Sequence, residues 1–286
     1  MDNDQPIGVI GLGLLGTAIA ERLLASGFHV IGYDIDVNRS RHLESLGGEA
    51  VESAAALAHS SERIILSLPT SQIAEVVVSE MLGNLRQGAI VIDTTTGDPD
   101  QMESLGKTLV GRDVSYLDAT VGGSSQQLRE RDVIVMVGGS QKTFDACRDL
   151  FDTFADRAFY IGPSGHGARM KLAVNLVLGL NRAVLAEGLA FAQATGLDAA
   201  EALEVFKAGP AYSRAMDVKG QKMLDGDFEP QARLSQHLKD VRLILDRAER
   251  TGTELPLSKT HRTMLEDLEA SGYGDKDNSA VIKAYE

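Results

Sequence analysis

Residues 7–16 read Ile7-Gly8-Val9-Ile10-Gly11-Leu12-Gly13-Leu14-Leu15-Gly16, and the rest of the fold is organised around this stretch. An apolar run leads into glycines at 11, 13 and 16, and a helix-like run from Thr17 to Ser26 follows. A second apolar run, His29 to Tyr33, then ends on Asp34. The order strand, glycine turn, helix, strand and acidic residue is typical of a dinucleotide-binding unit.

Each glycine of the turn has its own physical role. Gly11 permits the tight turn, Gly13 lets the backbone approach a pyrophosphate, and Gly16 lets the helix pack close to the strand. The helix N-terminus offers N–H groups and a partial positive charge to the phosphates. Glycines alone could form an ordinary turn, but the flanking strands, helix and acid favour a cofactor site. We expect these residues to contact the cofactor: Gly11, Leu12, Gly13, Leu14, Leu15 and Gly16.

Asp34 bears on which dinucleotide is bound. Its carboxylate would accept hydrogen bonds from the adenosine ribose hydroxyls, and its charge would repel a 2′-phosphate. NAD is therefore favoured over NADP. Arg39 and Arg41 follow closely. They could hold a 2′-phosphate or lie exposed on the next helix, so NADP remains the alternative.

The composition excludes several classes of protein. A chain of 286 residues is long enough for two domains, and 43% hydrophobic with 24% charged residues is ordinary for a globular protein. A net charge of −13 argues against nucleic-acid and anionic-membrane partners, so local cations must capture any acidic substrate. The single Cys147 excludes an internal disulfide framework, and we expect a cytoplasmic protein without a metal site.

The chain also gives two expectations about targeting. Its acidic first residues contain no apolar segment, so we expect no signal peptide. We also expect no run as long as a membrane span and no membrane partner.

Strands and helices alternate after Asp34, which predicts right-handed crossovers and a parallel sheet. Arg63 to Leu68 reads as a strand stopped by Pro69, and Ala89 to Asp93 as a strand followed by three threonines. Ligands lie outside the carboxyl ends of such strands. We therefore expect Leu68, Pro69 and Thr96 to contact the cofactor, although threonines also cap turns locally.

A possible anion site follows the next strand. Ser115–Asp118 and Asp132–Val137 read as strands joined by a loop, Ala119 to Ser125. The two glycines and two serines at 122–125 would expose several N–H groups and hydroxyls to one point, which suits a carboxylate. The same spacing is equally compatible with a flexible loop.

The pattern changes after Arg157–Ile161, the last strand. Ala168 to Ala194 reads as a long, mostly apolar helix, so we expect it to be buried, to connect two domains and to help bury a dimer interface. From Leu197 onward only helical periodicity is found. We predict an NAD-binding domain over residues 1–163, an all-α substrate and dimerisation domain over 164–286, and a homodimer or homotetramer.

Lys171 and Asn175 stand one turn apart on this helix and share a face. Burying an ammonium is costly unless it is paired or loses its proton. Desolvation and the charge of an oxidised nicotinamide both lower a lysine's pKa, so such a lysine can take a proton from an alcohol as hydride leaves. Asn175 could orient the lysine or bind a substrate hydroxyl. Alternatively, the lysine snorkels at the helix edge beside a surface asparagine.

Four motifs in order resemble the β-hydroxyacid dehydrogenase family over essentially the whole length. They are Gly8–Gly16, Asp93-Thr-Thr-Thr96-Gly-Asp-Pro99, Gly165-His-Gly-Ala-Arg-Met-Lys171-Leu-Ala-Val-Asn175, and Lys239-Asp240. The resemblance implies a Rossmann domain followed by an all-α dimerising domain. It also implies Lys171 as the catalytic acid/base, with Thr96 and Lys239 as cofactor and substrate contacts.

Two departures from the family put the substrate in doubt. The family's substrate segment commonly reads Asp-Ala-Pro-Val-Ser-Gly-Gly, whereas this chain has Asp118-Ala-Thr-Val-Gly-Gly-Ser-Ser125. The anion-binding serine is missing at 122, with Ser124 or Ser125 as possible replacements. The sulfolactaldehyde reductases also have glycine there, but this chain has no arginine at 123. Val174 stands where many relatives have a first asparagine.

Our first hypothesis is an NAD-dependent dehydrogenase of a small 3-hydroxy acid or the matching aldehyde acid. Its substrate-binding residues would be Gly122, Gly123, Ser124, Lys171 and Asn175. The first alternative is an imine reductase, a class that usually lacks the lysine. The second is a 6-phosphogluconate dehydrogenase, which needs a larger C-terminal domain. The third is a non-catalytic, chromatin-binding NAD(P) module, a class that has lost the lysine.

Overall fold

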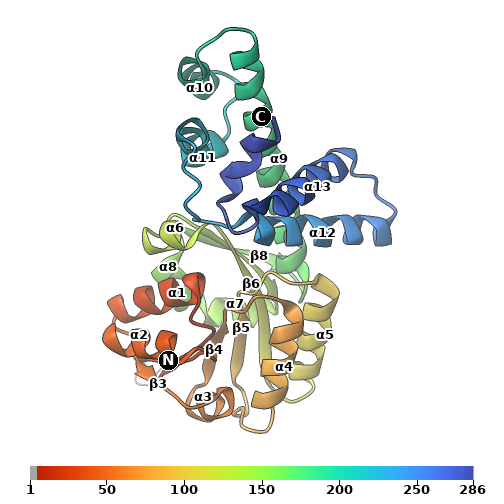
Figure 1. Ribbon diagram of the computed structural model, residues 1–286. Helices are drawn as coiled ribbons and strands as arrows, with labels where there is room; N and C mark the ends of the chain where they lie inside the picture. Colours follow the sequence, from red (N-terminus) through yellow and green to blue (C-terminus); the bar gives the residue numbers. More distant parts are fainter. Residues whose placement is uncertain (1–4, 286) are drawn as a thin grey trace. The chain divides into compact units, whose positions relative to one another are not determined.

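The computed structural model describes residues 5–285, and the chain folds into two compact units that divide between Lys171 and Leu172. The first unit is built on a sheet, and the second on helices (Figure 1).

The first unit contains, within the described residues, an eight-stranded sheet in the order β3-β2-β1-β4-β5-β6-β7-β8. The chain winds outward from β1 to β3 and then returns to add β4 on the other side of β1, which makes the sheet doubly wound. The strands are β1 (Ile7–Ile10), β2 (Val30–Tyr33), β3 (Glu49–Ala50), β4 (Arg63–Leu66), β5 (Ile90–Asp93), β6 (Ser115–Gly122), β7 (Ile134–Gly139) and β8 (Arg157–Gly162).

The expectation of a wholly parallel sheet is wrong at one pair. β6 and β7 are antiparallel, with Thr120 opposite Met136, whereas the other neighbouring strands of this sheet are parallel. Parallel strands need a long crossover connection. The segment between β6 and β7 holds only the short helix α6 (Ser125–Arg129), so the chain turns back on itself.

Successive side chains of a strand point to opposite faces of the sheet, and here the side chains on both faces are apolar. Helices cover each face and bury them. Val9 and Ile65 belong to one apolar cluster, together with α1, α6, α7 and α8. Ile10 and Ile64 belong to the other, together with α3, α4 and α5. The helices are α1 (Leu14–Ala25), α2 (Val37–Ser45), α3 (Ala54–Ser60), α4 (Ser71–Met81), α5 (Pro99–Val110), α7 (Gln141–Ala146) and α8 (Arg148–Phe154).

The second unit packs helices around one apolar core. The predicted stripe of Leu234, Leu238, Val241 and Leu245 lies in that core, which confirms the helical periodicity. The fold class is confirmed as an N-terminal Rossmann-type sheet domain, a C-terminal all-α domain and a long helix that belongs to both. The elements are α9 (His166–Ala194), α10 (Ala199–Ala208), α11 (Arg214–Asp225), α12 (Leu234–Thr251), α13 (Pro256–Leu268), η1 (Glu269–Tyr273) and η2 (Asn278–Tyr285).

α9 corrects two expectations. By length and composition alone it could cross a membrane, contrary to the prediction that no run is long enough, although core helices of globular proteins share this property. Only 44% of its most apolar window is buried. Val177, Val184 and Phe191 are 57%, 67% and 70% exposed, so this chain by itself leaves one side of the apolar helix uncovered.

Candidate active site

The glycine turn between β1 and α1 is built as the sequence predicts. Gly11 has a φ of 89°, and a Cβ there would lie 2.2 Å from the Ser67 carbonyl oxygen. A Cβ at Gly16 would lie 1.9 Å from the Gly11 carbonyl oxygen. At Gly13 a Cβ would meet only Arg39 Nη1, at 3.8 Å. Packing within the described chain therefore explains Gly11 and Gly16, whereas nothing in the described chain crowds Gly13, which leaves room there for a ligand.

The N-terminus of α1 follows this turn directly. Gly13 is the N-cap residue, and within the described residues no side chain caps the first N–H groups of the helix. The first N–H groups of any helix have no partner inside the helix. Together with the helix dipole they form a site for a phosphate. The turn and helix start thus fit the pyrophosphate of a dinucleotide.

Asp34 is fixed to this turn. Its Oδ2 accepts a hydrogen bond from the Leu12 N–H at 2.7 Å, and its Oδ1 accepts one from the Asp36 N–H at 2.8 Å. Arg39 Nη1 lies 3.4 Å from Oδ2. The carboxylate therefore stands beside the turn, as a ribose contact requires, but a guanidinium stands next to it. Arg41 lies exposed on α2.

The loops after β4 and β5 meet the turn. The Leu68 N–H donates to Thr95 Oγ1 at 3.2 Å, and a Cβ on Gly11 would lie 3.1 Å from Leu68 Cδ2. Pro69 is exposed and Thr96 is half-buried. The structure thus brings the loops of Leu68 and Thr96 to the edge of the sheet that carries the glycine turn.

A buried carboxylate holds the threonine loop. Asp93 Oδ1 accepts a hydrogen bond from the Thr95 N–H at 2.9 Å, and Oδ2 accepts one from the Tyr116 hydroxyl at 3.0 Å. Burial raises the pKa of Asp93 to about 6, against these hydrogen bonds, which lower it.

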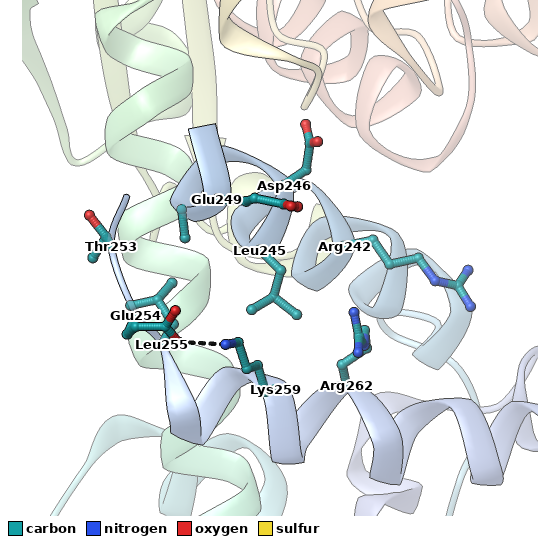
Figure 2. Close-up of a pocket in the computed structure, with 10 residues that line it drawn as sticks. Arg242, Leu245, Asp246, Glu249, Thr253, Glu254, Leu255, Lys259 and Arg262 are labelled. Carbon is teal, nitrogen blue, oxygen red and sulfur yellow. Dashed lines mark hydrogen bonds and ion pairs between the residues drawn. The ribbon is translucent and has the colours of Figure 1, made fainter. Parts of the chain in front are cut away.

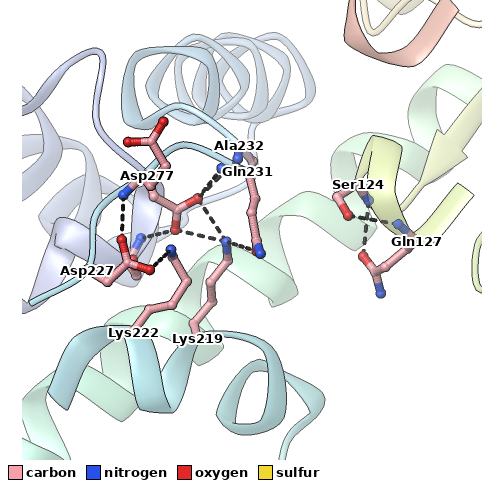
Figure 3. A network of polar contacts seen from close by, with 10 residues as sticks. Ser124, Gln127, Lys219, Lys222, Asp227, Gln231, Ala232 and Asp277 are labelled. Atoms are coloured by element: carbon pink, nitrogen blue, oxygen red, sulfur yellow. Dashed lines mark hydrogen bonds and ion pairs between the residues drawn. The ribbon is translucent and has the colours of Figure 1, made fainter. Parts of the chain in front are cut away.

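The open loop expected over Ala119–Ser125 is wrong. β6 continues to Gly122, and the side chains of β7 pack on it; a Cβ at Gly122 would lie 2.9 Å from Ile134 Cγ1. Ser124 is the N-cap of α6, where its Oγ accepts from the Gln127 N–H at 3.2 Å and its own N–H donates to Gln127 Oε1 at 3.0 Å (Figure 3). The cap thus occupies groups that the predicted anion nest would use. Substrate binding by Gly122, Gly123 and Ser124 stays a prediction.

Lys171 is buried, with 8% of its surface exposed. Its Nζ donates a hydrogen bond to the Val121 carbonyl oxygen at 2.7 Å. Val121 is the residue before Gly122, so the ammonium lies at the end of β6. The side chain does not snorkel into solvent, and the first part of α9 holds it against the sheet.

The second unit assembles three polar residues. Asn175 Nδ2 donates to Asp240 Oδ2 at 2.8 Å, and Lys239 Nζ lies 3.3 Å from Asp240 Oδ1. Asn175 and Asp240 are 5% and 7% exposed, so this asparagine is not an ordinary surface residue. Asp240 was not among the predicted site residues. The signal that could have found it is the Lys239-Asp240 motif itself, which contains this acid and lies on the buried side of α12.

A hollow of about 420 Å³ lies between α12 and α13 (Figure 2). Its lining carries charges of both signs, and Lys259 pairs with Glu254. No predicted site residue lines it. Its described lining is Arg242, Leu245, Asp246, Ala248, Glu249, Thr253, Glu254, Leu255, Lys259 and Arg262.

Comparison with known proteins identifies the family and the fold of the chain. Residues 6–162 match the family profile described as the NAD binding domain of 6-phosphogluconate dehydrogenase. Residues 165–285 match the profile described as NAD-binding of NADP-dependent 3-hydroxyisobutyrate dehydrogenase. A solved structure of 3-hydroxyisobutyrate dehydrogenase from Salmonella typhimurium superimposes with a TM-score of 0.89 at 26% identity, over 98% of this chain and 99% of that one.

Two curated relatives differ in length. 2-(Hydroxymethyl)glutarate dehydrogenase from Eubacterium barkeri is 29% identical over 100% of this chain and 96% of its own. Cytokine-like nuclear factor N-PAC from Drosophila melanogaster is 26% identical over 98% of this chain, which spans only 47% of that protein. From these matches and the glycine turn, the chain belongs to the β-hydroxyacid dehydrogenase family of NAD(P)-binding oxidoreductases that act on hydroxyl groups.

Proposed function

We propose that the protein transfers a hydride between NAD and a small 3-hydroxy acid, or the corresponding aldehyde acid, with Lys171 as the acid/base. The observation that carries the proposal is the buried Lys171, whose Nζ is held by the Val121 carbonyl oxygen at 2.7 Å. A lysine ammonium has three donors, and one of them fixes the group in place. A fixed proton donor in a desolvated position is what general acid/base catalysis needs.

The chain's own residues divide the work. Gly11 to Gly16 and the start of α1 bind the pyrophosphate, and Asp34 binds the adenosine ribose. Bound NAD accepts or supplies the hydride at its nicotinamide ring. Lys171 takes the proton from the substrate hydroxyl oxygen in oxidation and returns it in reduction. Asn175, one turn further on α9, binds or orients the hydroxyl.

The choice of NAD over NADP rests on Asp34. Its carboxylate is tied to the Leu12 N–H, so it cannot turn away from a 2′-phosphate without losing that hydrogen bond. Arg39 lies near both Asp34 and Asp36, and these two acids offset its charge. We expect NADH to bind more tightly than NADPH in a fluorescence titration. An Asp34→Ser variant should narrow that difference, and a wild type that prefers NADPH would overturn the assignment.

The experiment that tests the proposed function follows NADH absorbance while the protein meets NAD and small hydroxy acids. The panel contains 3-hydroxyisobutyrate, glycerate, threonate, serine, 4-hydroxybutyrate and dihydroxypropanesulfonate. For the active member, Lys171→Ala should lower kcat by about 10²–10⁴-fold, the usual share of a general acid/base. NADH binding, measured separately, should be unchanged. A variant that keeps most of its rate would refute the role of Lys171.

We also propose that a second copy of the chain covers the exposed side of α9. Val177, Val184 and Phe191 are spaced by seven residues, so they form one stripe along the helix. Light scattering after size exclusion should give the mass of a dimer or tetramer. Phe191→Glu should reduce that mass, and a monomeric wild type would contradict the proposal.

A further inference from the structure

One carboxylate holds the start of α9. Asp118 Oδ1 accepts a hydrogen bond from the Gly165 N–H at 2.7 Å, and Oδ2 accepts one from the Ala168 N–H at 2.8 Å. Asp118 is fully buried in β6. The first N–H groups of a helix lack partners inside the helix, and a negative charge there matches the helix dipole. A single side chain thus supplies acceptors for two N–H groups at the start of α9.

The same strand makes two further contacts with the first turns of α9. Thr120 Oγ1 donates to the Gly167 carbonyl oxygen at 3.2 Å, and the Val121 carbonyl oxygen accepts from Lys171 Nζ at 2.7 Å. β6 is paired on both sides, with β5 and β7, so it is a rigid support. Asp118, Thr120 and Val121 therefore join the helix start and Lys171 to one fixed strand.

Two glycines show that the carboxylate is closely enclosed. A Cβ at Gly138 would lie 2.5 Å from Asp118 Oδ1. A Cβ at Gly167 would lie 2.4 Å from the Asp118 carbonyl oxygen and 2.9 Å from its Oδ2. Both positions must be glycine for Asp118 to reach the helix. The enclosure leaves the carboxylate little room to move.

We propose that Asp118 is a positioning residue for Lys171: by capping α9 it fixes where the helix begins, and so places the ammonium at the end of β6. This inference rests on the proposed function of Lys171. Asp118 touches the backbone of α9 rather than the reacting atoms, so its effect passes through the lysine. Because general acid/base catalysis depends on reach, a small displacement of the helix start is enough to slow turnover.

The experiment is a double-mutant cycle with Asp118→Asn, Lys171→Ala and the pair. Asparagine keeps the size of the side chain but replaces one acceptor with a donor that faces an N–H. We expect kcat to fall by about 10–100-fold, the cost of a misplaced catalytic group. The Kd for NADH should stay within about twofold, because the glycine turn is untouched. In the Lys171→Ala background, Asp118→Asn should cause no further loss.

Asp198→Asn is the matched control. Asp198 also caps a helix, but locally and far from Lys171 along the chain: it is the N-cap residue of α10 in the second unit, and its Oδ1 accepts from the Ala200 and Glu201 N–H groups at 2.9 Å. Its loss should leave kcat unchanged. If Asp118→Asn does not fold, Thr120→Val takes its place in the cycle. Thr120→Val should lower kcat by a smaller factor, and in the Lys171→Ala background it should cause no further loss.

The outcomes separate the two proposals. An unchanged kcat in Asp118→Asn, or an equal loss with and without Lys171, would overturn the positioning role and leave the proposed function standing. A Lys171→Ala protein that keeps most of its rate would refute the proposed function itself, whatever Asp118 does.

Discussion

Asp93 and Asp118 are register partners on the neighbouring parallel strands β5 and β6, and both are fully buried. Burial raises the pKa of each carboxyl to about 6, and hydrogen bonds from Thr95 and from Ala168 oppose the shift. Two carboxylates so close are costly to ionise together. Their ionised forms at neutral pH are held by Tyr116 and by the start of α9.

This pair predicts a pH dependence of stability. A folded pKa near 6, above the ordinary 3.8, gives a stability contribution that is complete below pH 3.8 and is lost as the pH rises through 6. Asp93→Asn should remove the pH-dependent part of the unfolding free energy that Asp93 contributes, at most about 3 kcal/mol. Urea unfolding at pH 4.5 and 7 checks this. The wild type should lose more unfolding free energy than the variant between the two pH values, and equal losses would contradict the assignment.

His261 in the second unit predicts the opposite pH dependence, a stability that decreases as the pH falls. Burial lowers its pKa to about 4, and Arg182 adds to the effect. The folded unit resists protonation, so stability present above pH 6.5 is lost as the pH falls toward 4. In scanning calorimetry, the melting temperature of the second unit should fall below that of the first as the pH is lowered from 7 to 4.5. His261→Phe should reduce that separation, whereas a separation of the same size in the variant would disprove the cause.

The glycine turn gives a matched pair of substitutions. Gly16→Ala places a methyl group 1.9 Å from the Gly11 carbonyl oxygen, so α1 must move and the protein should lose thermal stability. Gly13→Ala meets only the end of Arg39, at 3.8 Å, so the melting temperature should stay close to that of the wild type while NADH affinity falls. Thermal denaturation and NADH titration check both. A Gly13→Ala protein with unchanged affinity would exclude close approach of the pyrophosphate.

Asp277 predicts a large effect on the second unit. Its oxygens accept hydrogen bonds from Lys219 Nζ at 2.8 and 2.9 Å and from the Gln231 and Ala232 N–H groups, at a fully buried position (Figure 3). Asp277→Ala leaves a buried lysine unpaired and should cost roughly 3–5 kcal/mol of unfolding free energy. Urea unfolding measures it.

The control for that experiment is the neighbouring pair Lys222–Asp227, whose acid is exposed (Figure 3). Asp227→Ala should have a small effect, because an ion pair with an exposed carboxylate contributes little. Similar losses in the two variants would show that burial is not the reason for the importance of Asp277.

Local chemistry explains what the sequence predicted well. The glycine turn and Asp34 belong to one short strand–helix–strand unit, so their spacing in the sequence is enough to predict how they are arranged. The extension of β6 could not be read in the same way. Ala119 to Gly122 resemble a loop because of their glycine, and only pairing with β7 makes them a strand.

The buried positions of the acids were the second feature that the sequence could not predict. Asp118 caps a helix 47 residues further along the chain, and Asp240 meets an asparagine 65 residues before it. An isolated aspartate in the sequence reads as a surface residue, because burying a carboxylate is costly without partners. Its partners here become visible only once the chain has folded.

The long helix α9 limits how this protein can be recombined with others. His166 to Lys171 belong to the first unit and Leu172 to Ala194 to the second, within one uninterrupted helix. A chimera joined between Lys171 and Asn175 with one extra residue would turn Asn175 by about 100° around the helix axis, since a turn holds 3.6 residues. Grafting a foreign helical domain therefore requires the register of α9 to be kept to the residue, whereas exchanges joined in the loop after Thr195 tolerate differences in length.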